Sequence, residues 1–125
     1  MITKLKPNDI FVFGSNGQGH HGAGAAKFAL DKGWTELGNS HGLSQSGKAY
    51  AIDTMDGLRQ FHEDLARLFL HANLNKQNRF LLTPVGTGIA GYSKSDVLYL
   101  IEQASREVHH DFNNSNVIFT EEWNL

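Results

Sequence analysis

The sequence predicts a single α/β domain with a parallel or mostly parallel sheet covered by helices. Short apolar runs alternate along the chain with segments of helical apolar spacing, in the order strand, helix, strand, helix, strand, helix, strand. Two glycine-rich loops each follow a strand and lead into a helix. The 125 residues, of which 40% are hydrophobic and 19% charged, suit one globular domain over residues 1–125.

The first strand is expected at residues 10–13, a continuous apolar run between Asp9 and Gly14. Such a run is typical of a strand buried on both faces, as in a parallel sheet. The five glycines in residues 14–24 predict a loop. The alanine-rich residues 23–32 then predict a helix that ends near Gly33.

The middle of the chain predicts a loop, a strand and a helix. Residues 34–47 are polar and punctuated by glycine, and residues 50–52 are a short apolar run. Apolar residues then recur at spacings of three and four, which predicts an amphipathic helix from Met55 to about Ala72.

The last third predicts two more strands with a helix between them. Residues 80–82, together with Pro84 and Val85, read as a third buried strand, and the second glycine loop follows at 86–91. Residues 93–96 supply candidate N-caps for a helix that extends to about His109. Residues 117–119 form the final strand.

Composition limits the classes of partner and compartment. The formal net charge of −2 disfavours nucleic-acid binding, although backbone N–H groups can bind a small anion without side-chain charge. The chain has no cysteine, which excludes disulfides and thiolate chemistry and fits a reducing compartment. Its start has no apolar run of signal-peptide length, and no run is long enough to span a bilayer. We therefore expect a cytoplasmic protein without a membrane partner.

The two glycine loops predict a phosphate-binding cleft. In an open α/β sheet, ligands bind outside the carboxyl ends of the strands, which is where both loops lie. Backbone N–H groups at a helix start favour negative charge, and glycine lets a phosphate oxygen approach the backbone. Two such loops on neighbouring strands suit a diphosphate held from both sides. The alternative is that the glycines only form tight turns.

Residues 17–22 read G-x-G-x-x-G, the pattern of the dinucleotide-binding fingerprint. Residues 14–16 intervene between the strand and the first of these glycines, where the fingerprint has none. The fingerprint also needs an acidic residue at the end of a following strand, about 20 residues further on. Glu36 lies in a loop, and Asp53 stands too far along the chain. An NAD-binding redox protein of the Rossmann type is therefore the less favoured alternative.

Three segments resemble the macro domain, the ADP-ribose-binding α/β/α module. They are Asp-Ile-Phe-Val-Phe-Gly-Ser-Asn at 9–16, Gly-Ala-Gly-Ala-Ala at 22–26 and Pro-Val-Gly-Thr-Gly-Ile-Ala-Gly-Tyr at 84–92. The third is the most specific. The chain looks most like a short branch of the family found in bacteria and phages, and the resemblance implies a three-layer α/β/α fold.

The resemblance also implies ligand contacts. Asp9 would accept a hydrogen bond from the adenine amino group, and Asn16 and Tyr92 would lie at the distal ribose. The two glycine loops would wrap the diphosphate, with Ile89 as a lid. The implied set is Asp9, Ile10, Gly14, Ser15, Asn16, Gly22, Ala23, Gly24, Val85, Gly86, Thr87, Gly88, Ile89, Ala90, Gly91 and Tyr92.

The resemblance does not extend to the family's catalytic carboxylates. Hydrolytic members carry an acidic residue at the position of Ala23 or of Ala90, and the glycohydrolase signature with paired glutamates is absent. No cofactor and no metal site are expected. Binding is thus implied more directly than catalysis.

Four side chains remain candidates for catalysis. Asn16 can orient a water, and His20 and His21 can act as a general base or contact a phosphate. Lys27 stands one turn into the first helix, where a lysine nucleophile lies in one branch of macro-like hydrolases. The alternatives are exposed loop histidines, a histidine pair that binds a metal, and a plain surface lysine.

Two functions follow from the resemblance. The first is hydrolysis of an ADP-ribose derivative, as by an ADP-ribosyl hydrolase or an ADP-ribose-1″-phosphate phosphatase. The second is non-catalytic binding of ADP-ribose, free or on an ADP-ribosylated macromolecule. Whether the loop 34–47 closes over the ligand is left open by the sequence.

Overall fold

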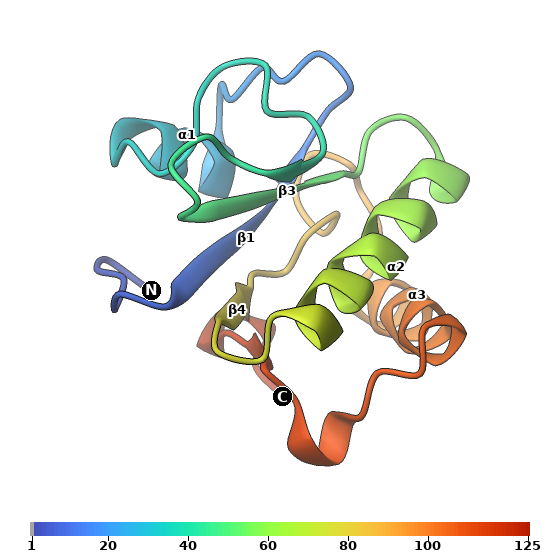
Figure 1. The fold of residues 1–125 in the computed structure, drawn as a ribbon. Helices are drawn as coiled ribbons and strands as arrows, with labels where there is room; N and C mark the ends of the chain where they lie inside the picture. Colours follow the sequence, from blue (N-terminus) through green and yellow to red (C-terminus); the bar gives the residue numbers. More distant parts are fainter. Residues whose placement is uncertain (1) are drawn as a thin grey trace.

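The computed structural model describes residues 2–125 and has a five-stranded sheet at its centre (Figure 1). The strands are β1 Asp9–Ser15, β2 Gly42–Leu43, β3 Ala49–Asp53, β4 Arg79–Leu82 and β5 Val117–Phe119. The helices are α1 Gly24–Asp31, α2 Leu58–Leu74 and α3 Lys94–Glu107, with 3-10 turns at Phe112–Asn114 and Glu121–Trp123.

The sheet is mostly parallel, which confirms the predicted α/β class with a mostly parallel sheet. Its order is β2-β3-β1-β4-β5, and only the pair of β2 and β3 is antiparallel. The chain leaves the central β1 toward β3 on one side and leaves β4 toward β5 on the other. The carboxyl ends of β1 and β4 therefore flank the topological switch point, which is the usual ligand position in such sheets.

Side chains of β1 alternate between two cores on the two faces of the sheet. Ile10 and Val12 pack with α2 and α3, and Phe11 and Phe13 pack with α1 and Trp34. All four β1 side chains are at most 3% exposed. This double burial explains why the strand reads as a continuous apolar run.

Helix ends follow local chemistry. Ser93 caps α3 as expected, because its hydroxyl accepts a hydrogen bond from the Asp96 N–H at 3.1 Å. Helix α2 begins at Leu58 rather than Met55, since Gly57 before it has a φ of 97°. None of the described helices is long and apolar enough to cross a membrane.

Two sequence expectations need correction. Pro84 and Val85 do not continue β4, which ends at Leu82. Proline has no N–H to donate to a strand ladder, and the chain turns at Gly86 with a φ of 78°. The segment 34–47 is not wholly loop, because Gly42 and Leu43 form the short strand β2 on β3.

Candidate ligand-binding site

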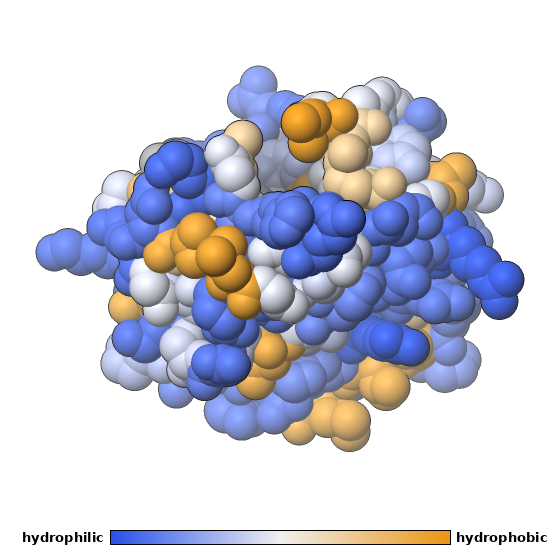
Figure 2. Space-filling model, turned by 90° about the horizontal axis from the view of Figure 1, so that it is seen from above, coloured by the Kyte–Doolittle hydropathy of each residue, from blue (hydrophilic) through white to orange (hydrophobic). Residues whose placement is uncertain are grey.

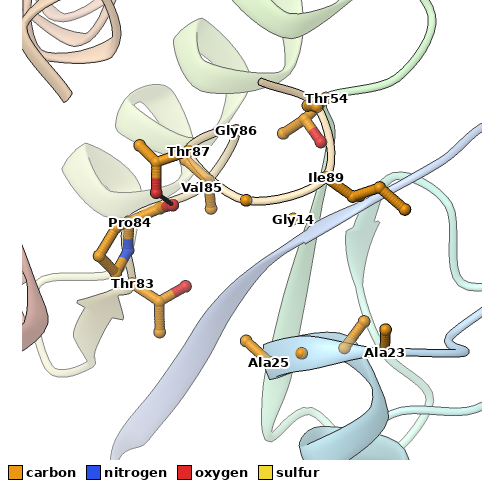
Figure 3. A pocket seen from close by; sticks show the side chains of 14 residues that line it. Gly14, Ala23, Ala25, Thr54, Thr83, Pro84, Val85, Gly86, Thr87 and Ile89 are labelled. Atoms are coloured by element: carbon orange, nitrogen blue, oxygen red, sulfur yellow. Dashed lines mark hydrogen bonds between the residues drawn. The ribbon is translucent and has the colours of Figure 1, made fainter. Parts of the chain in front are cut away.

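A cleft of about 330 Å³ lies between the start of α1 and the loop 86–91, at the carboxyl ends of β1 and β4. Figure 3 shows Ala23 and Ala25 on one side, Ile89 on the other and Gly14 between them. The lining residues are Gly14, Ala23, Gly24, Ala25, Ala26, Thr54, Thr83, Pro84, Val85, Gly86, Thr87, Gly88, Ile89 and Ala90. The structure thus brings both predicted glycine loops to one cavity.

The first wall is the start of α1. Ala23 is its N-cap, with extended backbone angles, and no described side chain accepts a hydrogen bond from the helix start there. The first N–H groups of a helix have no partner within the helix. Together with the helix dipole, these free N–H groups make the wall suitable for an anion.

The second wall is the loop 86–91. The Thr87 hydroxyl donates to the Pro84 carbonyl at 2.7 Å, and the Tyr92 N–H donates to the Gly86 carbonyl at 3.0 Å, so the loop is braced from both ends. Within the described chain, the N–H groups of residues 88–90 donate to no protein acceptor. A second set of free backbone donors therefore lines the same cleft.

The floor of the cleft carries small or already bonded groups. Gly14 lies in β1, and a Cβ there would stand 3.4 Å from the Thr54 side chain. The Thr83 hydroxyl donates to the Val12 carbonyl at 2.7 Å. The lining contains no ionisable side chain, so its polarity comes from backbone groups and threonine hydroxyls.

A second, apolar pocket continues from the first. It has about 410 Å³ and shares four lining residues with the cleft, namely Gly24, Ala25, Thr83 and Pro84. Its other lining residues are Ile2, Phe11, Phe28 and Glu122. A cleft with free backbone donors that adjoins an apolar pocket suits a ligand with a charged part and a flat apolar part.

The structure does not bring Asp9 and Ile10 to either cavity. Asp9 opens β1, whose seven residues place it about 20 Å from the carboxyl end. Its carboxylate accepts hydrogen bonds from the Arg79 guanidinium at 2.8 and 3.2 Å and from the Lys6 N–H at 3.0 Å. Asp9 is thus a buried ion-pair partner rather than a group open to adenine, which corrects the role carried over from the resemblance.

Asn16 and Ser15 hold the backbone instead of lining the cleft. The side-chain oxygen Oδ1 of Asn16 accepts hydrogen bonds from the N–H groups of Gln18 and His20, each at 3.1 Å. Its side-chain Nδ2 donates to the His20 backbone carbonyl at 2.8 Å. The Ser15 hydroxyl donates to the Ser40 carbonyl. In this structure these side chains close the loop after β1.

His21 is buried, not exposed. It is 3% exposed, its ring meets Phe13 edge-on with centroids 5.2 Å apart, and its Nε2 lies 2.9 Å from the Glu36 carbonyl. Burial lowers the pKa of His21. His20 is exposed, and neither histidine lines the cleft.

Four further residues of the predicted site do not line the cleft: Lys27, Tyr92, Gly22 and Gly91. Lys27 Nζ pairs with Asp31 at 2.7 Å on the exposed face of α1. The Tyr92 ring packs against Phe61, with centroids 5.6 Å apart. Of the four catalytic candidates, none is brought to the cleft in this structure.

Two of the G-x-G-x-x-G glycines, Gly17 and Gly19, serve the packing of two loops. Gly19 has a φ of 66°, and a Cβ there would stand 2.4 Å from Gly38. The Gly38 N–H donates to the Gly19 carbonyl at 3.0 Å, and the Ser40 hydroxyl to the Gly17 carbonyl at 3.1 Å. The segment 34–47 is therefore docked on the loop after β1, and none of its residues lines the cleft.

Sequence reasoning missed a cluster of carboxylates beside the cleft. His41 Nδ1 lies 2.7 Å from Asp64, and Asp64 also accepts from the Asp53 N–H at 2.8 Å. The Gly17 N–H donates to Asp56 at 2.8 Å. Burial, and then the neighbouring Asp56, raise the pKa of Asp53, whereas the Asp53 hydrogen bond lowers the pKa of Asp56.

Within residues 2–125, this cluster joins the cleft through Thr54, which follows Asp53 and lines the cavity. Among the described residues no group of three or more His, Asp or Glu is arranged to hold a metal ion. Thr54 and Thr83 were both predictable, because each directly follows a parallel strand whose carboxyl end faces the site. No local signal marks Phe28 or Glu122, which enter the apolar pocket through tertiary packing.

No protein-family model, curated protein or solved structure matches this chain.

Proposed function

We propose that the protein binds ADP-ribose or a close derivative. One observation carries the proposal: the cleft between the two glycine loops continues into an apolar pocket. The diphosphate lies between the start of α1 and the loop 86–91, and the adenine lies in the apolar pocket. Both cavities are within the size range of small-molecule sites, about 300–1,000 Å³.

The free backbone donors on both walls support the diphosphate position. Residues 88–90 and the first turn of α1 offer N–H groups from opposite sides of one cleft. An anion held by such groups needs no lysine or arginine, which agrees with the absence of charged side chains from the lining.

The aromatic side chains of the apolar pocket support the adenine position. Phe11 and Phe28 line it, with ring centroids 6.3 Å apart, and Pro84 joins it to the cleft. A flat base buries apolar surface there, while the phosphates remain beside the backbone donors of the cleft. Figure 2 shows apolar groups scattered over a largely hydrophilic face, which favours a small ligand over a broad protein interface on that face.

The arrangement of the helices supports a macro-like, three-layer architecture. Helices α2 and α3 pack with one core of the sheet and α1 with the other. The glycine loop 86–91 then lies across the switch point from the start of α1, as the resemblance implies.

Binding without catalysis is the function that the site supports best, because the cleft has no ionisable lining residue. Hydrolysis of an ADP-ribose conjugate is a second candidate. The observation that favours it is the Asp53–Asp56 pair beside Thr54, since two carboxylates with pKa values shifted apart can divide acid and base roles.

Calorimetry with ADP-ribose, NAD and AMP tests the proposal, and ADP-ribose should bind most tightly. Gly88 accepts a side chain, because no atom lies within 4 Å of a Cβ there. Gly88→Asp should lower the affinity for ADP-ribose about tenfold or more, because the added carboxylate repels the diphosphate. A tenfold loss of affinity corresponds to about 1.4 kcal/mol of binding free energy.

Gly88→Asn is the matched control, similar in shape but uncharged, and it should weaken binding much less. Thermal melting checks that both variants fold. No detectable ADP-ribose binding to the unmodified protein at millimolar concentration contradicts the proposal. Mass spectrometry after incubation with ADP-ribosylated protein and ADP-ribose-1″-phosphate separates a hydrolase from a binding module.

A further inference from the structure

A basic groove lies at the amino ends of strands β1 and β3, whereas the glycine loops lie at the carboxyl ends of the parallel strands. It has about 400 Å³, and four of its eight lining residues are lysines. The lining residues are Thr3, Lys4, Leu5, Lys6, Pro7, Lys32, Trp34 and Lys48. No aspartate or glutamate lines the groove, although the chain has 13 acidic and 11 basic residues.

Three separate segments form the groove. The segment before β1 is held by two hydrogen bonds of 3.0 Å, from the Lys6 N–H to Asp9 and from the Asp9 N–H to the Lys6 carbonyl. Lys32 follows the last residue of α1, and the Lys48 carbonyl accepts from the Phe11 N–H at 2.9 Å. The fold therefore gathers lysines that lie far apart in the sequence.

One carboxylate, that of Asp9, interacts with a charge of the groove, because the charge of Lys6 helps to lower the pKa of Asp9. No carboxylate of the described residues forms an ion pair with Lys4, Lys6, Lys32 or Lys48. The Asp9 carboxylate is bonded to the Lys6 N–H of this segment, and it also pairs with Arg79. Four lysines line one concavity, and the Nζ of one of them, Lys32, lies 5.6 Å from the centroid of the Phe28 ring. Positive charges gathered around a concavity attract an anion.

The wall of the groove strengthens its attraction for anions. Trp34 is 7% exposed, and its ring packs on Phe11 and Phe28 with centroids 5.2 and 5.7 Å apart. A concave surface with an apolar wall focuses the field of the charges around it. The buried indole is not open for stacking, so charge rather than base recognition governs this groove.

We propose that this groove binds clustered phosphate groups, either on a free oligophosphate or along a single nucleic-acid strand. Lysine ammonium groups bind phosphate as compact point charges. The groove contains the segment that precedes β1, whereas the glycine-loop cleft lies beyond the carboxyl end of that strand, about 20 Å away. The groove shares no lining residue with the cleft or with the apolar pocket, although Trp34 in its wall packs on Phe11 and Phe28 of that pocket. We therefore treat the groove as a second site, whose assignment does not depend on ADP-ribose binding.

Titration with tripolyphosphate and with a short single-stranded oligodeoxynucleotide at low salt tests the proposal. The double variant Lys4→Gln with Lys48→Gln should weaken binding of the effective probe about tenfold or more and should reduce its salt dependence. Lys27→Gln with Lys76→Gln removes the same charge elsewhere and should have little effect. Gly88→Asp, which blocks the other cleft, should leave this binding unchanged.

Each outcome decides the proposal. Binding of tripolyphosphate alone identifies a free oligophosphate as the ligand, and binding of the oligonucleotide identifies phosphates along a strand. The proposal is overturned if neither probe binds at millimolar concentration, if the two double variants weaken binding equally, or if Gly88→Asp alone abolishes it.

Discussion

At the scale of single residues, Asp9 shows how a side chain with a suggestive position can have a structural role. Its carboxylate is 5% exposed and bonded to Arg79 and the Lys6 N–H. Burial by itself raises the pKa of Asp9, but the hydrogen bonds and charges of Arg79 and Lys6 outweigh burial and lower it. The carboxylate therefore stabilises the fold in its charged form.

Asp9→Asn should lower the free energy of unfolding by about 1–3 kcal/mol at neutral pH, because the bonds to Arg79 lose their charge partner. Because the folded pKa is lowered, this stabilisation is present above the ordinary aspartate value and is lost as the pH falls through the folded value. Urea unfolding at several pH values measures it. The ADP-ribose affinity should stay unchanged, and a large loss of affinity with unchanged stability would instead place Asp9 at the ligand.

At the scale of elements, the loop 86–91 depends on Gly86 for its position against α2. Gly86 has a φ of 78°, and a Cβ there would stand 2.6 Å from the buried Phe61 ring. Phe61 belongs to α2, so the loop and the helix fix each other's position. The backbone donors of residues 88–90 reach the cleft only with this turn in place.

Gly86→Ala should destabilise the protein by about 1–3 kcal/mol, since the added methyl meets Phe61 and the left-handed backbone is unfavourable for alanine. Guanidinium unfolding measures the loss. Gly88→Ala is the matched control, because a Cβ there meets nothing within 4 Å, and it should change stability little. Equal stability of the two variants would show that Phe61 and the turn adapt freely.

At the scale of the whole molecule, charge and burial are distributed unevenly. The groove of four lysines lies at the amino ends of β1 and β3, and the uncharged cleft lies at the carboxyl ends of β1 and β4. Three histidines are partly or fully buried in separate parts of the fold, and burial lowers the pKa of each: His21, His71 and His110. Protonation of these three histidines therefore affects the stability of the whole fold.

Stability should decrease as the pH falls from about 7 toward 5. The folded state resists protonation of these histidines, so the unfolded chain binds more protons below its ordinary histidine pKa. His71→Phe should reduce this dependence, because phenylalanine retains the ring contacts with Tyr50 and Phe80. Urea unfolding across this range, with His20→Gln as an exposed control, measures it, and an unchanged slope in His71→Phe would exclude His71 as a contributor.

By itself the sequence determined the alternating elements, the mostly parallel sheet and the meeting of two glycine loops at one edge. These features depend on local spacing and on the rule that parallel strands share their carboxyl edge. Ser93 as the cap of α3 and Gly86 as a turn residue were readable for the same reason. The short strand β2 could not be predicted from the sequence, because its two residues are too few to show a periodic pattern.

Only the tertiary structure decided which polar side chains are free for a ligand. Asp9, Asn16 and His21 carry chemistry that suits a site. The Asp9 carboxylate is engaged by Arg79, the Asn16 side-chain amide by the backbone of the loop after β1, and the His21 Nε2 by the Glu36 carbonyl. The same packing joined Phe28 to Glu122 in one pocket and gathered the lysines. Contacts between distant segments settle such questions, and local sequence spacing does not encode them.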